Sequence, residues 1–131
     1  MSLANKSLAL VVIRTENFTV LIERRYIAKM QVMPEERAVP LPALRIEELL
    51  GIQLTESETT PEEPHLLVIK QTQDEFALQV CGDVGLIELP CSAIHALPEL
   101  VAKKNKFPYL RALAVFEQTI GLIIDPSYIT L

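Results

Sequence analysis

The chain has 131 residues, of which 50% are hydrophobic, so it can bury a core without disulfides or metals. Lysine and arginine number 12 and aspartate and glutamate 17, which gives a net charge of −5. This balance argues against a sequence-independent nucleic-acid binder and against an anionic membrane surface as partner, because both require a basic face. The longest apolar runs are far shorter than a membrane span, and no signal peptide is recognisable, so we expect no membrane insertion.

Two cysteines, Cys81 and Cys91, are too few for a disulfide framework. We expect both to be free, buried thiols of a cytoplasmic protein, because small apolar cysteines are common in reducing compartments. A single disulfide between them is the alternative.

The apolar runs in the first part of the chain are short and β-branched, which is typical of strands. Residues 8–15 (LALVVIRT) predict a buried strand, and residues 16–23 (ENFTVLIE) predict an alternating strand joined to it as a hairpin. Residues 24–33 (RRYIAKMQVM) fit either a strand or a helical turn.

A single clear helix follows. Residues 41–52 (LPALRIEELLGI) place leucine and isoleucine on one broad side, so they predict an amphipathic helix. Glu47 and Glu48 are expected on its exposed side, and Gly51 stands where a helix usually ends. The acidic, proline-containing residues 53–64 predict a solvated loop.

The second part of the chain again begins with a hairpin, formed by 65–72 (HLLVIKQT) and 75–82 (EFALQVCG). A further strand is expected over 84–90 (VGLIELP), followed by a linker over 91–106. Two final strands, 109–116 (YLRALAVF) and 120–125 (IGLIID), form a closing hairpin. Asp125 then caps a terminal helical turn that starts at Pro126. The pattern predicts a mostly β fold, either barrel or sandwich, with one helix and one terminal turn.

Signals of catalysis are scarce. The four glycines form no phosphate-binding loop, and His65 and His95 stand in no metal-ligand spacing with the cysteines, so we expect no cofactor and no metal. A small thiol enzyme that uses Cys81, with His95 as its base, is the alternative from another class. Acidic β domains of this kind most often bind other proteins through edge strands or apolar grooves.

Taken in order, four segments resemble the CheW-like family of bacterial chemotaxis coupling proteins. They are VVIRTENFTVLIERR (11–25), VPLPALRIEELLGI (39–52), LLVIKQTQDEFALQVCGDVGLIELP (66–90) and YLRALAVFEQTIGLIIDPSYI (109–129). The resemblance implies a single domain over 1–131 with two small, SH3-like, five-stranded β-barrels. We expect their subdomains near 8–52 and 65–131, with the first one truncated.

The resemblance also implies a function. Members of the family are adaptors without enzymatic activity that join chemoreceptors to the histidine kinase CheA. A non-enzymatic adaptor with a CheA-type kinase or a chemoreceptor-like protein as partner is therefore expected. A diverged domain that regulates another motility or two-component pathway is the alternative.

The sequence departs from the family pattern between YIAKMQVMPEE (26–36) and RAVPLPAL (37–44). The strand and the Asn-Leu-Arg-Gly turn that the family carries there are missing, and Cys81 replaces a usual acidic residue. We therefore expect an incomplete first barrel with an open edge, which a partner strand or a second copy of the chain could fill.

The partner-binding surface of the family corresponds to positions on two segments of this chain. The resemblance assigns Glu23, Arg24, Arg25 and Ile27 after the first hairpin, and Leu66 on the strand that opens the second barrel. The alternative reading makes the two arginines a solvated strand end and Leu66 a core residue.

Overall fold

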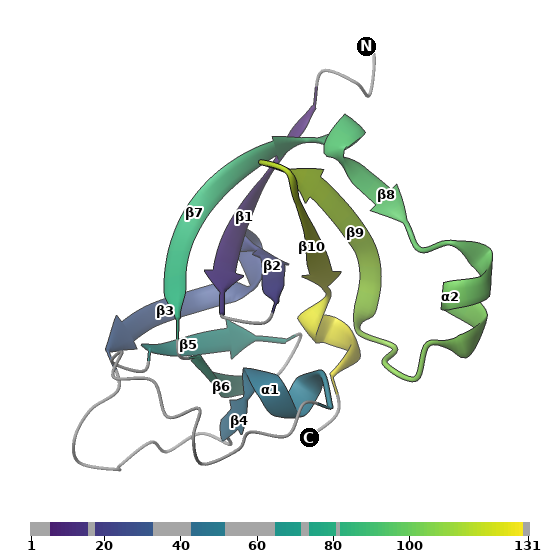
Figure 1. Cartoon of the computed structure of the whole chain (residues 1–131). Coiled ribbons are helices and arrows are strands. Elements are labelled where there is room, and N and C mark those ends of the chain that lie inside the picture. Colours follow the sequence, from purple (N-terminus) through teal and green to yellow (C-terminus); the bar gives the residue numbers. More distant parts are fainter. Residues whose placement is uncertain are drawn as a thin grey trace. The chain divides into compact units, whose positions relative to one another are not determined.

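The structure is a computed structural model that describes residues 6–15, 18–32, 43–51, 65–71, 74–80 and 82–129. The chain forms two compact units, shown in Figure 1. Unit 1 comprises Met1–Arg24 and Asp83–Thr130, and unit 2 comprises Arg25–Gly82 and Leu131. No helix within the described ranges is long and apolar enough to cross a membrane.

Unit 1 is built on a six-stranded sheet with the order β7-β1-β2-β10-β9-β8. Figure 1 shows β7 and β9 as strongly bent strands, so that the sheet curves around its own interior. Its strands are β1 (Ser7–Arg14), β2 (Thr19–Glu23), β7 (Asp83–Pro90), β8 (Ile94–Ala96), β9 (Leu110–Phe116) and β10 (Thr119–Ile124).

The position of β1 explains its unbroken apolar sequence. The strand pairs antiparallel with β2 on one side and with β7 on the other. All four residues from Leu10 to Ile13 are at most 3% exposed, so both faces of the strand are buried. Strands covered on both faces carry continuous rather than alternating apolar runs. The predicted hairpin of β1 and β2 is confirmed, and Thr15 N donates a hydrogen bond to Phe18 O across its turn at 3.0 Å.

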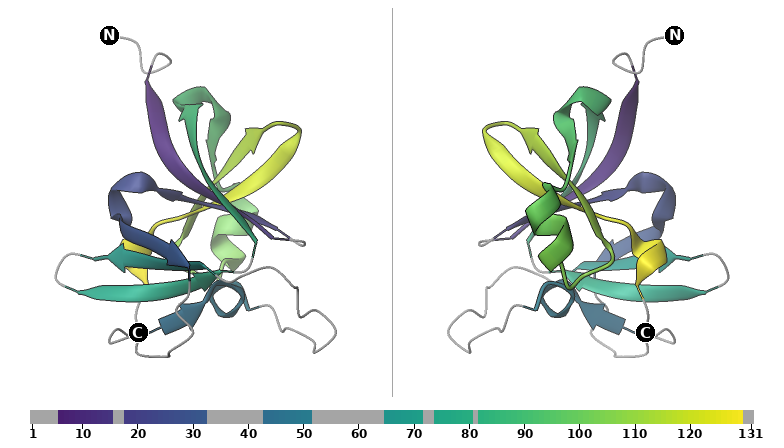
Figure 2. Two further views of the ribbon diagram at one scale, coloured as in Figure 1. Left: turned by 90° about the vertical axis from the view of Figure 1, so that its left-hand side faces the viewer. Right: turned by 90° about the vertical axis from the view of Figure 1, so that its right-hand side faces the viewer.

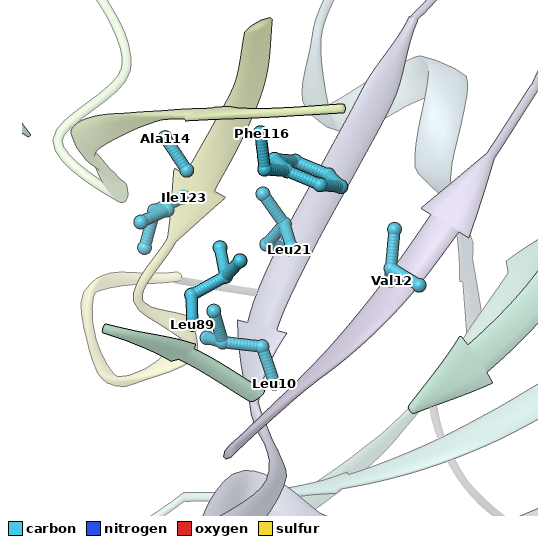
Figure 3. Close-up of a cluster of buried hydrophobic side chains, with 7 residues drawn as sticks. All are labelled: Leu10, Val12, Leu21, Leu89, Ala114, Phe116 and Ile123. Atoms are coloured by element: carbon cyan, nitrogen blue, oxygen red, sulfur yellow. The ribbon is translucent and has the colours of Figure 1, made fainter. Parts of the chain in front are cut away.

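One face of the unit 1 sheet carries the hydrophobic core shown in Figure 3. Val12 lies opposite Leu21 in the β1–β2 ladder, and Leu21 lies opposite Ile123 in the parallel β2–β10 ladder, so three neighbouring strands contribute to one cluster. The seven buried members are Leu10, Val12, Leu21, Leu89, Ala114, Phe116 and Ile123. The cluster joins strands from both ends of the chain, which explains why the closing hairpin is so apolar.

Gly121 lies where this core is tightest. A Cβ atom at this position would collide with Leu21 Cδ1 and would lie 3.1 Å from Phe116 Cε1. We therefore expect Gly121→Ala to lower the free energy of unfolding by about 1–3 kcal/mol, the usual cost of overpacking a core. Urea denaturation followed by circular dichroism measures this loss.

Gly85→Ala is the matched control for that substitution. Gly85 also lies in a strand of unit 1, but a Cβ there would meet Val12 Cγ1 at an ordinary 3.7 Å. The control is expected to be close to wild type in stability. Equal stabilities of the two variants would contradict the close packing of Gly121 against Leu21.

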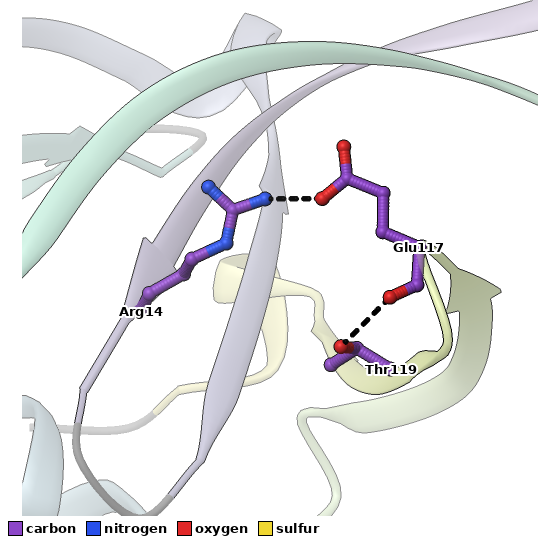
Figure 4. A network of polar contacts seen from close by, with 3 residues as sticks. All are labelled: Arg14, Glu117 and Thr119. Atoms are coloured by element: carbon purple, nitrogen blue, oxygen red, sulfur yellow. Dashed lines mark hydrogen bonds and ion pairs between the residues drawn. The ribbon is translucent and has the colours of Figure 1, made fainter.

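The closing hairpin of β9 and β10 is confirmed, and its turn is strained. Glu117 and Gln118 have φ angles of 47° and 60°, which lie in the left-handed region that residues other than glycine seldom adopt. Arg14 Nη2 donates to Glu117 Oε2 at 3.0 Å, and Thr119 Oγ1 donates to Glu117 O at 3.3 Å, as Figure 4 shows. The first contact links the turn to β1, although this ion pair is exposed and adds little stability, and the second lies within the turn.

The end of the described chain follows the sequence prediction. Asp125 Oδ1 accepts a hydrogen bond from Ser127 N at 3.0 Å, and the 3₁₀ helix η5 (Pro126–Tyr128) begins at Pro126. Asp125 N in turn donates to Tyr109 O at 2.8 Å, which ties the turn to the residue before β9.

Unit 2 contains a four-stranded sheet with the order β3-β5-β6-β4. The predicted hairpin of β5 and β6 is confirmed, with Leu67 opposite Leu78 in an antiparallel ladder. The strands are β3 (Ile27–Val32), β4 (Ala43–Arg45), β5 (His65–Lys70) and β6 (Glu75–Val80). The segment after β2, for which the sequence fitted either a strand or a helical turn, contains both. The 3₁₀ helix η2 (Arg24–Tyr26) leads directly into β3.

The helix predicted over 41–52 is much shorter in the structure. Residues Ala43–Arg45 form β4, parallel to β6, and only Ile46–Leu49 form the helix α1. Gly51 does end it, with a φ of 68° that suits glycine. Glu47 was expected on the exposed side and is only 8% exposed, with its Oε2 4.0 Å from Arg45 Nε. Glu48 is exposed as predicted, but a single turn between β4 and the following residues leaves only this one position of α1 in solvent, which explains the error at Glu47.

The prediction of a linker over 91–106 is also wrong. The segment contains the 3₁₀ helix η4 (Cys91–Ala93), the strand β8 and the helix α2 (Glu99–Lys104). The sequence carries a signal for α2, because Pro98 precedes it, Glu99 stands in its first turn and basic residues stand in its last. Cys91 is exposed rather than buried, since it lies in η4 outside the sheet.

The expected class of fold, mostly β with two sheets and few short helices, is confirmed. The sheets have six and four strands among the described residues, instead of five in each barrel. The compact units also have other bounds than the subdomains expected at 8–52 and 65–131. The reason is strand pairing: the first hairpin joins β7 and β10 from the end of the chain, not β3 and β5.

Candidate partner-binding surface

The residues that the sequence assigns to partner binding start at the passage from unit 1 to unit 2. Glu23 ends β2 and is half-buried, while Arg24 and Arg25 open η2 and are both exposed. The boundary of the two units falls between the two arginines. The 3₁₀ turn projects neighbouring side chains in different directions, so the pair presents two cations to solvent at a bend in the chain.

Arg25 is the more constrained of the two cations. Its Nη2 donates a hydrogen bond to Tyr26 Oη at 2.9 Å, and its guanidinium carbon lies 4.7 Å from the centre of the Tyr26 ring. A guanidinium stacked on a ring has fewer conformations to lose on binding. The contact therefore restricts the conformations of the Arg25 side chain.

Ile27 begins β3 and is half-buried. The ladder to β5 is irregular here, since Ile27 lies opposite Ile69 and Lys29 opposite Val68, which leaves Ala28 as an extra residue. Such bulges are frequent at sheet edges. In the described strand order β3 is indeed an edge, and its Met30 is 50% exposed.

Leu66 is not on the surface. It lies on β5 between Gln31 of β3 and Gln79 of β6, and it is 1% exposed. A partner can therefore reach this side chain only if the structure opens. The placement agrees with the alternative that Leu66 is a core residue.

A second exposed surface lies on unit 1, where the sequence predicted only a linker. The helix α2 has no buried residue, and its Leu100 and Val101 are 74% and 47% exposed. Together with Phe107 and Leu110 they line a cavity of about 470 Å³ that is shallow and wide open to solvent. Tyr109 lies beside this wall with its ring 5.7 Å from that of Phe107, and burial raises its pKa. The right-hand view of Figure 2 shows α2 in front of the strands of unit 1.

Groups with catalytic or metal-binding potential are spread apart. In the ranges that the structure covers, no three histidine, cysteine, aspartate or glutamate side chains are grouped so that they could hold a metal ion. His95 lies on β8 opposite Leu113, and His65 begins β5 with a buried Nδ1 that has no hydrogen-bond partner among the described atoms. Cys81, the nucleophile of the thiol-enzyme alternative, lies outside the described residues.

Comparison with known proteins supports the fold. No protein family matches the chain by sequence, and no curated protein does. Among solved structures, the scaffolding protein TtCheW from Thermoanaerobacter tengcongensis is similar, with a TM-score of 0.68. The structural match covers 91% of this chain and 89% of that one. The two sequences are 12% identical, so the likeness is one of fold. The structure thus has a CheW-like fold, as the ordered segments of the sequence predicted.

Proposed function

We propose that the protein is a non-enzymatic adaptor of chemotaxis-type signal transduction, which couples a CheA-type histidine kinase to a chemoreceptor or a related partner. The observation that carries this proposal is the likeness of fold to a scaffolding protein over nine-tenths of the chain. The acidic composition and the exposed cations of η2 are compatible with a cytoplasmic protein whose ligands are other proteins.

The proposed contact surface is the segment Glu23, Arg24, Arg25 and Ile27, with Leu66 supporting β3 from the interior. Its chemistry fits an acidic partner surface, because exposed guanidinium groups can form charge-assisted hydrogen bonds with carboxylates. Ile27 supplies the half-buried apolar neighbour that such a contact needs at its centre.

Binding of the purified chain to the regulatory domain of a CheA-type kinase from the same organism tests this function. We expect Arg24→Glu to raise the dissociation constant about tenfold or more in isothermal titration calorimetry, because it replaces attraction by like-charge repulsion. Unchanged affinity of this variant would contradict a role of η2 in the contact. Absence of any binding by the wild type would contradict the adaptor function itself.

Lys70→Glu is the matched control. Lys70 is an exposed cation at the end of β5, so its reversal changes the net charge equally without touching η2. Its affinity should remain within about twofold of wild type, since isolated surface charges contribute little. An equal loss in both variants would indicate a general charge effect and contradict a local contact.

We also propose that the edge of β3 pairs with a second copy of the chain. Within the described residues β3 has one strand neighbour, β5, and its side chains from Ala28 to Met30 are exposed. An edge strand with exposed apolar side chains is a template for strand addition. Light scattering across a concentration series should show a dimer that Met30→Lys shifts to monomer, whereas a wild-type monomer at all concentrations contradicts the pairing.

A further inference from the structure

The helix α2 is an unusual addition to unit 1. It has six residues, far too few to be stable alone in water, and none of them is buried. It therefore adds nothing to the core in Figure 3, and its leucine, Leu100, is 74% exposed to solvent. An apolar side chain kept in water on a helix that the core does not need indicates a surface with a binding role.

The cavity beside α2 is formed by an ordered turn. Asn105 Nδ2 donates hydrogen bonds to Phe107 O at 2.8 Å and to Leu110 O at 3.2 Å, while its Oδ1 accepts one from Phe107 N at 2.9 Å. One side chain thus fixes the backbone from the end of the helix to the start of β9. The apolar wall of Leu100, Val101, Phe107 and Leu110 is therefore formed before any ligand arrives.

The rim of the cavity has the opposite charge to the whole chain. Lys104 and Lys106 line it, Lys103 stands beside them on α2, and Glu99 is the single acidic residue of α2, a local balance of +3 − 1 = +2 in a chain of net charge −5. Lys103 Nζ lies 3.4 Å from Glu99 Oε1. Lys104 and Lys106 line the cavity itself, and no described carboxylate forms an ion pair with either. Two cations beside an apolar wall suit a ligand that is both acidic and apolar.

We infer that this cavity binds an acidic amphipathic segment of a partner protein. One or two apolar side chains of the segment enter between Leu100 and Leu110, and its carboxylates lie beside Lys104 and Lys106. A cavity of this volume holds such anchors, and helix-in-groove recognition uses this combination of contacts. An anionic membrane offers similar chemistry, but it attracts a protein through a broad basic face, whereas only two lysines, Lys104 and Lys106, line this cavity. The inference does not rest on the proposed coupling function.

A synthetic peptide of sequence ELEELLAEIEEL, labelled with fluorescein, tests the inference by fluorescence anisotropy with the full chain. We expect micromolar binding that weakens as salt is added, because part of the attraction is electrostatic. Leu100→Ser and the double variant Lys104→Glu/Lys106→Glu should each weaken binding about tenfold or more. Leu100, Lys104 and Lys106 are all exposed and none belongs to the core, so circular dichroism should show an unchanged fold.

Leu86→Ser is the control variant, since Leu86 is 65% exposed on β7, at the opposite end of the strand order from β8, the strand that leads to α2. It should bind the peptide within about twofold of wild type. A peptide with serine in place of each leucine and isoleucine should not bind. Equal binding by all variants, absence of peptide binding, or binding to phosphatidylserine vesicles in place of the peptide would each overturn the inference.

Discussion

Ile123→Asp is expected to unfold unit 1. Ile123 is 9% exposed and packs with Leu21 and Phe116 in the cluster that joins both ends of the chain (Figure 3). Burial of a carboxylate without a partner costs several kcal/mol, and a domain of this size has a total stability of about 5–15 kcal/mol. The variant should therefore lose its cooperative transition in urea, or appear largely in the insoluble fraction on expression.

Ile120→Asp provides the control in the same strand. Ile120 is 63% exposed, opposite Val115 at the outer end of the β9–β10 hairpin. A charge there remains hydrated, so the free energy of unfolding should change by about 0.5 kcal/mol or less. A soluble Ile123→Asp protein with a wild-type midpoint would show that this core assignment is wrong.

Phe76→Ala is expected to have the largest effect in unit 2. Phe76 is fully buried on β6, opposite Ile69 of β5, and it is the largest of the fully buried side chains. Truncation of a buried phenylalanine costs about 3–5 kcal/mol, because transfer energy is lost and a cavity remains. Guanidinium denaturation followed by circular dichroism measures the loss.

Glu75→Ala serves as the comparison, since Glu75 precedes Phe76 in the same strand and is exposed opposite Lys70. Its effect should be within about 0.5 kcal/mol. Amide hydrogen exchange shows where the destabilisation is felt. In Phe76→Ala we expect the amides of β5 and β6 to lose protection first, and protection that is lost only in unit 1 would contradict the assignment.

The exposure of the residues proposed for partner binding could be predicted only in part. Arg24 and Arg25 are exposed, as a contact surface requires, because charged side chains at a strand end remain in water wherever the strand pairs. Leu66 and Leu100 show the limit of this reasoning. Both are leucines within short apolar stretches, yet one is 1% exposed and the other 74%. Their difference depends on neighbouring elements that local patterns do not specify.

The sequence by itself determined most strands and turns of this chain, but it assigned β4 to a helix and β8 and α2 to a linker. The β-branched runs of β1, β5 and β10, the Asp125–Pro126 cap and the left-handed Gly51 were all predictable, because each depends on backbone preferences within a few residues. Only the tertiary structure decided which strands share a sheet. Pairing of β1 with β7 and of β2 with β10 joins the first hairpin to strands in the second half of the chain, and many apolar strands could satisfy the same local pattern. The exposure of α2 depends on that pairing too, because the paired strands form the core of unit 1 without it.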